Sequence, residues 1–217
     1  MSLPWEILWG MDGVLIDSAE LHYRSWLETL TRHHIPFSKD AFSQTFGKNN
    51  TQTIMELIAF PEMNLVRIID QEKEIYFREN IPSCARIFEG VIPWLTQFKE
   101  WGFPQAIASS APQANLDALV DFLEIRPYFQ AIISGQHLPS KPHPAVFLRA
   151  AESLNIPTSR CIVIEDSIHG IAGAKRAGIK TIGVATSQPL RALDQADLAV
   201  QRLTDLTLHQ VKNLLRL

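Results

Sequence analysis

Short apolar runs alternate with segments of helical periodicity along most of the chain. The apolar runs end at glycine or polar residues and predict buried strands at residues 6–9, 105–108, 131–133, 161–164, 181–184 and 198–200. The segments between them predict helices at residues 91–101, 112–122, 144–154, 168–177 and 206–214. Strands that alternate with helices are typical of a parallel sheet covered on both faces. The pattern therefore predicts an α/β protein with a Rossmann-like core.

The stretch that follows the first strand carries no strand signal up to residue 83. Its apolar spacing instead predicts helices at residues 18–34, 40–46 and 51–58 and a long helix through residues 65–76. Asp17 and Glu20 have the spacing of a capping box, so we interpret Asp17 as the N-cap of the first of these helices. A helical insert of this kind indicates a cap domain, residues 18–85, on a core of residues 1–17 and 86–217. Hinges near residues 15–18 and 82–88 would let the cap close as a lid and exclude water.

Four of the predicted strands are followed by unusual polar residues. They are Asp12 after the first strand, Ser109 and Ser110 after the second, Lys141 beyond the third, and Glu165 with Asp166 after the fourth. Because ligands bind at the carboxyl ends of parallel strands, we expect these side chains to surround one site. A cation and a hydroxyl suit a bound phosphate, whereas an acidic pair beside them indicates a divalent cation such as Mg²⁺.

The same residues resemble the four motifs of the haloacid dehalogenase (HAD) superfamily. The GMDGV sequence at residues 10–14 is similar to the first motif, DxDGV, and Ser109, Lys141 and Glu165–Asp166 match the second, third and fourth. Successive motif residues are separated by 97, 32 and 25 positions, in the family's order and over nearly the whole chain. The first helix of the insert, with His22, is similar to the β-phosphoglucomutase-like branch. The resemblance implies the HAD fold with an inserted helical cap.

The resemblance also implies roles for the motif residues. In this family an aspartate at position 10 attacks phosphorus, and Asp12 acts first as general acid and then as general base. Ser109 and loop amides hold the phosphoryl oxygens, while Lys141 neutralises their charge. Mg²⁺ is held by the carboxylate at position 10, the main-chain carbonyl of Asp12 and Asp166, with Glu165 assisting.

Further substrate contacts are expected from four residues outside the central motif positions. Ser110 and Asn115 lie in a segment that resembles the family's sugar-phosphate phosphatases. His22 and Lys73 lie in the predicted cap, from which they would reach the substrate. The partner that these residues imply is a small phosphorylated metabolite.

Position 10 departs from the family pattern, because the chain carries Gly10 where the nucleophilic aspartate belongs. Glycine removes both the nucleophile and one anionic metal ligand. Loss of a nucleophile costs on the order of 10⁴–10⁶ in rate, so we expect the chain to be nearly inactive. Two interpretations stay open: a change introduced into an active enzyme, since one base separates the codons, or a natural pseudoenzyme that binds phosphorylated ligands without turnover.

Phosphatase activity on a sugar phosphate is favoured over mutase activity by one feature of the cap. Mutases of this branch place an arginine after a cap-loop glycine to hold a second phosphate. Here Asn50 stands at the matching place after Gly47, and Lys48 is the residue that would compensate. Haloacid dehalogenation is disfavoured because Asp12 is a phosphotransfer acid/base that the dehalogenases lack.

Composition and charge indicate which partners and which cellular location to expect. A net charge of −3 over 217 residues provides no basic field for nucleic acid, and no apolar run is long enough to span a membrane. The chain begins without an export signal, and Cys84 and Cys161 lie far apart without a CxxC pair. We therefore expect a cytoplasmic protein with two buried thiols, and a monomer.

Overall fold

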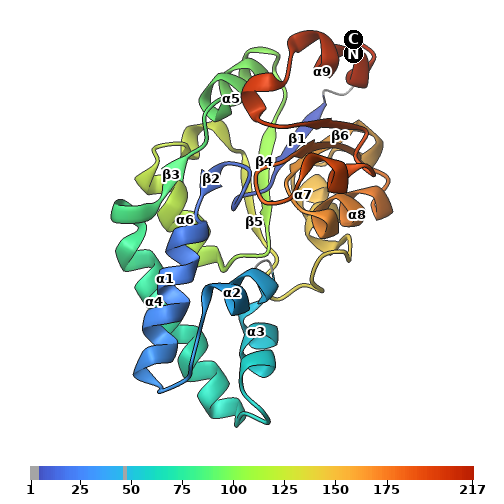
Figure 1. Cartoon of the computed structure of the whole chain (residues 1–217). Helices are drawn as coiled ribbons and strands as arrows, with labels where there is room; N and C mark the ends of the chain where they lie inside the picture. Colours follow the sequence, from blue (N-terminus) through green and yellow to red (C-terminus); the bar gives the residue numbers. More distant parts are fainter. Residues whose placement is uncertain (1–4, 46–47) are drawn as a thin grey trace. The chain divides into compact units, whose positions relative to one another are not determined.

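The computed structural model describes residues 5–45 and 48–217 (Figure 1). These residues form two compact units. One unit comprises the described residues up to Asp17 together with Arg86–Leu217, and the other is Ser18–Ala85. The chain leaves and re-enters the first unit through a two-stranded antiparallel sheet of β2, Ile16–Asp17, and β3, Arg86–Ile87.

The first unit is built on a six-stranded sheet in which every pairing is parallel. Its strands, in the spatial order β5-β4-β1-β6-β7-β8, are Ala131–Ser134, Gln105–Ser109, Glu6–Trp9, Cys161–Glu165, Lys180–Val184 and Leu198–Val200. The first strand of the chain thus lies near the centre, flanked by β4 and β6. This topology confirms the predicted parallel α/β core of the HAD type.

Successive side chains of the central strand β1 face opposite layers of helices. Leu8 packs in a core cluster with Phe147 of helix α7, Ala145–Ser153. Trp9 lies edge-on to Phe98 of helix α5, Val91–Glu100, with ring centroids 6.0 Å apart, and its indole N–H donates to Gln105 Oε1 at 3.0 Å. Both faces of the sheet are therefore covered, which explains why its strands are continuous apolar runs.

The predicted helices of the first unit are all present, with ends that differ by at most two residues. They are α5, Val91–Glu100; α6, Gln113–Phe122; α7, Ala145–Ser153; α8, Ile168–Arg176; and α9, Leu208–Leu215. Short 3-10 turns lie at Arg126–Tyr128, Thr158–Arg160, Leu190–Leu193 and Leu203–Asp205. In the described residues, no helix has the length and apolarity needed to cross a membrane.

The second unit, Ser18–Ala85, is helical throughout its described part. Its helices are α1, Ala19–Arg32; α2, Lys39–Thr45; α3, Asn50–Leu57; and α4, Met63–Cys84. The long α4 extends well beyond residue 76, and the predicted end of α2 at residue 46 lies outside the described residues. A cluster around Trp26, Leu30 and Ile69 forms the unit's own core.

Two predictions near the unit boundary were wrong. The N-cap of α1 is Ser18, whose side chain makes no capping bond. Asp17 is not the N-cap, because it pairs with Arg86 in the small sheet. Glu20 binds Arg24 at 2.7 Å instead of completing a capping box. Cys84, at the end of α4, is half-buried, whereas Cys161 is buried as expected.

Candidate functional site

The loops after β1, β4 and β6 begin at the same edge of the sheet. Trp9 is level with Ile107 on one side and with Ile164 on the other. The chain continues the ladder one step further, where the Gly10 amide donates to the Ile164 carbonyl at 3.0 Å. Parallel pairing therefore brings the ends of the three strands, and the polar residues after them, to one place.

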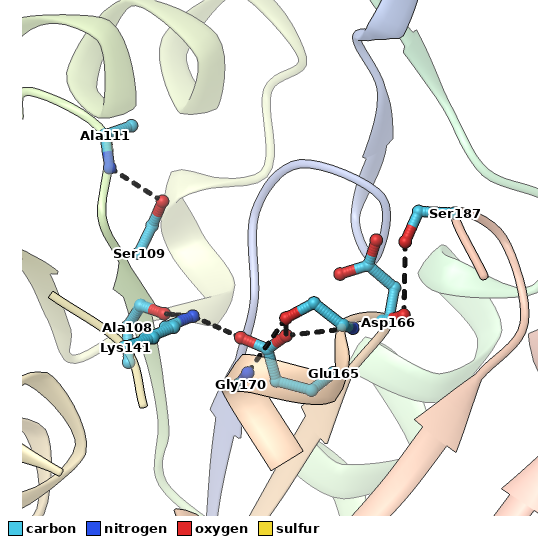
Figure 2. A network of polar contacts seen from close by, with 9 residues as sticks. Ala108, Ser109, Ala111, Lys141, Glu165, Asp166, Gly170 and Ser187 are labelled. Atoms are coloured by element: carbon cyan, nitrogen blue, oxygen red, sulfur yellow. Dashed lines mark hydrogen bonds and ion pairs between the residues drawn. The ribbon is translucent and has the colours of Figure 1, made fainter. Parts of the chain in front are cut away.

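An ion pair joins the loop after β5 to the end of β6. Lys141, from the loop after β5, binds the Glu165 carboxylate through its ammonium, which also lies 3.4 Å from the Ala108 carbonyl at the end of β4 (Figure 2). The ammonium stands over the Phe147 ring, 4.9 Å from its centroid. Both partners are largely shielded from solvent, with side-chain exposures of 14% and 3%. The Glu165 carboxylate and the Lys141 ammonium thus compensate each other's charge at the strand ends, where both are largely shielded from solvent.

The second oxygen of Glu165 is bound by its own loop. Ser167 Oγ donates to Glu165 Oε2 at 3.0 Å and, as the N-cap of α8, accepts from the Gly170 amide at 2.9 Å. The carboxylate packs against the α-carbon of Gly170, where a methyl group would be 2.1 Å from Oε2. Glu165 is therefore fixed between Lys141 and the start of α8, and its assistance to a metal stays a prediction.

Asp166 faces the loop that follows β1. Its Oδ2 lies where a methyl group on Gly13 would come within 2.0 Å. Ser187 Oγ donates to the Asp166 carbonyl at 3.1 Å (Figure 2). Thr186 Oγ1 donates to the Gly13 carbonyl, so the loop after β7 contacts both the loop after β1 and the loop after β6. Burial, followed by the charge of Glu165, raises the pKa of Asp166 to about 7.

Gly10 lies between β1 and this loop and is buried. A Cβ atom built on it would stand 2.8 Å from Val14 Cγ2 and 3.4 Å from the Ile164 carbonyl oxygen. Its φ angle is outside the left-handed region, so the backbone accepts a side chain without strain. The obstacle to an aspartate here is the Val14 methyl group, which occupies the space that its first carbon would need.

Ser109 and its neighbours form the loop after β4. Ser109 is buried, and its hydroxyl accepts from the Ala111 amide at 3.2 Å. Ser134 Oγ donates to the Ala111 carbonyl at 2.6 Å and ties this loop to the end of β5. Ser110 is exposed, whereas Asn115 is buried on α6. The substrate contacts expected from Ser110 and Asn115 stay predictions.

The remaining predicted site residues divide between the two units. Asp12 is half-buried directly before Gly13, in the loop that Asp166 contacts. His22 and Lys73 belong to the helical unit, and their contribution to substrate binding stays a prediction. Among the described residues, no group of three histidine, cysteine, aspartate or glutamate side chains is arranged to hold a metal ion.

Three residues at this edge were not singled out from the sequence. Ser167 holds Glu165, while Thr186 and Ser187 bind the loops that carry Gly13 and Asp166. A serine directly before an apolar helical run is an N-cap signal, and Thr186 with Ser187 follows the predicted strand 181–184. The rule that ligands gather at strand ends, applied to this strand as well, would have found them.

The fold and this arrangement define a HAD-type hydrolase core, and comparison with known proteins agrees. The family of haloacid dehalogenase-like hydrolases matches residues 7–184. The chain belongs to this family, in its β-phosphoglucomutase-like branch.

Individual relatives match over nearly the whole chain. β-Phosphoglucomutase of Bacillus subtilis is 28% identical over 211 residues, covering 93% of this chain and 91% of that protein. Hexitol phosphatase B of Escherichia coli is 29% identical over 218 residues, covering 95% and 97%. Among solved structures, a HAD hydrolase of family IA, variant 3, from Entamoeba histolytica superposes with a TM-score of 0.88 at 26% identity, covering 98% of this chain and 100% of that one.

Proposed function

We propose that the chain binds a small phosphorylated metabolite, a sugar phosphate, at the carboxyl edge of its sheet. The site follows the design of a Mg²⁺-dependent phosphatase. The observation that carries the proposal is the buried Lys141–Glu165 pair beside Asp166, because a structural ion pair would not require a second buried carboxylate at its side. Relatives named as hexitol phosphatase and fructose-1-phosphate phosphatase support a sugar phosphate as the substrate class.

Lys141 and Ser109 hold the phosphoryl oxygens. An ammonium has three N–H donors. Lys141 directs one at Glu165 and one toward the Ala108 carbonyl, which leaves the third for the ligand. The Ser109 hydroxyl accepts from the Ala111 amide and so can donate its own proton to a phosphoryl oxygen. Glu165 acts by holding the ammonium in this position.

Mg²⁺ suits the oxygen donors around Asp166. Burial, and then the charge of Glu165, raise the pKa of Asp166 and so disfavour its ionised form, and a cation next to it would offset this cost. Asp166 and the main-chain carbonyl of Asp12 are the residues that would hold the ion. When bound, Mg²⁺ supplies positive charge that stabilises the phosphoryl oxygens.

Turnover is nearly absent in the chain as it stands. Asp12 can still give and take a proton, but no carboxylate stands at position 10 to attack phosphorus. The expected loss is on the order of 10⁴–10⁶ in rate relative to an enzyme with aspartate there. Binding by Lys141, Ser109 and Asp166 does not depend on that nucleophile.

Two neighbouring functions differ from this proposal in specific residues. A mutase needs a cation at the place of Asn50 to hold a second phosphate. The Asn50 amide instead donates to Asp70 and Glu74, both at 2.6 Å. Lys48, the residue that would compensate, pairs with Glu56 at 2.6 Å. A binding protein without turnover is the second candidate. It is favoured by the Val14 methyl group, which fills the space beside Gly10.

A panel of sugar phosphates, assayed for phosphate release with Mg²⁺, tests the proposal. We expect almost no release by the unmodified chain and a gain of several orders of magnitude in Gly10→Asp. Gly10→Asn is the matched control, since it adds the same bulk without a nucleophile. If Gly10→Asp folds, binds phosphate and still gains nothing over Gly10→Asn, the phosphatase reading is wrong and the binding protein is favoured.

A further inference from the structure

A buried lysine lies in the middle of the helical unit. Lys73, on α4, is 2% exposed, and its ammonium stands over the rings of Trp26 and Phe77, 5.5 and 5.2 Å from their centroids. Its Nζ donates to Glu74 Oε1 at 2.7 Å, and Glu74 is itself only 6% exposed. Two aromatic faces and a carboxylate are the surroundings that stabilise a charged ammonium.

The same ammonium contacts a histidine of α1. Lys73 Nζ lies 3.3 Å from His22 Nδ1. Because an ammonium has only donors, the nitrogen that it faces must offer a lone pair. A neutral imidazole carries one hydrogen, which must then be on Nε2. We propose that Lys73 is a positioning residue that fixes His22 as the neutral Nε2–H tautomer.

Neighbouring contacts hold both partners in this arrangement. The Asn50 side-chain amide donates to Asp70 Oδ1 and Glu74 Oε1, and so links the first residue of α3 to α4. The His22 ring lies against Phe77, with centroids 4.6 Å apart and planes at 39°. Phe77 thus sets the orientation of the imidazole, while Lys73 sets the position of its hydrogen.

The tautomer determines what His22 can recognise. An Nε2–H group donates a hydrogen bond and cannot take a proton there. A ligand atom bound by this nitrogen must therefore be an acceptor, such as a hydroxyl or phosphoryl oxygen, and His22 does not serve as a general base through it. This consequence for the ligand rests on the proposed function, whereas the tautomer itself is a property of the free protein.

Long-range ¹H–¹⁵N correlation spectra of ¹⁵N-histidine-labelled protein, recorded without ligand at neutral pH, test the inference. The His22 signals are assigned by their loss in His22→Gln. We expect the Nε2–H pattern in the unmodified chain, retention of that pattern in Lys73→Arg, and a mixture of both tautomers in Lys73→Met. Lys39→Met is the matched control, because Lys39 stands over Tyr23 in the same unit, 5.6 Å from its centroid, and its loss should leave His22 unchanged.

Three outcomes would overturn the inference. They are an Nδ1–H pattern in the unmodified chain, a doubly protonated ring at neutral pH, and an unchanged pattern in Lys73→Met. If Lys73→Met does not fold, the spectrum of the unmodified chain still decides. Since the spectra are recorded without ligand, the tautomer that they show does not depend on whether the phosphatase assay succeeds or fails.

Discussion

The Asp166 carboxylate lies directly against the α-carbon of Gly13, so that even a methyl group there would be 2.0 Å from Oδ2. Gly13 also has a φ of +75°, a conformation that side-chain-bearing residues rarely adopt. The contact joins the loop after β1 to the loop after β6. Through it, glycine at position 13 permits both the turn and the approach of the acidic side chain.

Gly13→Ala should destabilise the protein by more than its backbone strain alone. Gly102 provides the matched control, since its φ is +72° and a Cβ there would meet nothing within 4 Å. We expect Gly102→Ala to cost about 1 kcal/mol and Gly13→Ala to cost clearly more, because Asp166 must move. Urea unfolding measures both free energies. Equal losses of unfolding free energy in the two variants would show that the Asp166 carboxylate moves aside without a cost in stability.

Lys141→Met should leave Glu165 buried without its cation. Removal of one partner of a buried ion pair costs about 3–5 kcal/mol. The exposed pair Lys175–Asp197 is the control, and Lys175→Met should cost less than about 1 kcal/mol. Adding Glu165→Gln to Lys141→Met should recover part of the stability. A loss in Lys141→Met no larger than in Lys175→Met would contradict the account.

Glu6 should make the protein less stable as pH rises. Burial raises the pKa of Glu6 from 4.5 to about 7, and its Oε1 has no hydrogen-bond partner. The unfolded chain therefore ionises first, so stability present below pH 4.5 is lost as pH rises to about 7, by up to about 3 kcal/mol. Asp166 adds a loss of the same sign.

Glu6→Gln separates the two contributions. The free energy of unfolding, measured by urea titration at pH 4.5 and pH 7.5, should fall less steeply in Glu6→Gln than in the unmodified chain. The remaining slope belongs mainly to Asp166. Parallel slopes in the two proteins would show that Glu6 is ionised in the folded state at neutral pH.

Val14 should limit what Gly10→Asp alone can restore. Its Cγ2 lies 2.8 Å from the place of the added Cβ, and the side chain is fully buried. We expect Gly10→Asp/Val14→Ala to release phosphate about tenfold faster than Gly10→Asp, a difference of about 1.4 kcal/mol in barrier. Val14→Ala alone is the control and should release none. If the double variant gains nothing, the methyl group moves aside at little cost.

The sequence predicted the elements of the sheet well because each strand is a short apolar run bounded by glycine or polar residues. Strands β1 and β8 were found at their true limits, and the helices of the first unit differ by one or two residues at their ends. The strand-end rule also named the polar residues that the parallel pairing brings to one edge. These features depend on periodicity, which a single sequence carries.

The small sheet of β2 and β3 could not be predicted, because two-residue strands show no period. Its pairing of Asp17 with Arg86 is also why α1 starts a residue later than expected. Burial of Lys73 was missed for a different reason. A lysine on a helix is normally solvated, and only tertiary contacts with Trp26 and His22 of α1 reverse that expectation.

The central claim is that the strand ends form one site for a divalent cation and a phosphoryl group. Isothermal titration of the unmodified chain with inorganic phosphate, with and without Mg²⁺, tests it most directly. We predict phosphate binding that requires Mg²⁺, is lost in Asp166→Asn and is kept in Lys175→Met. Absence of Mg²⁺-dependent binding, or equal binding in folded Asp166→Asn, would contradict the account.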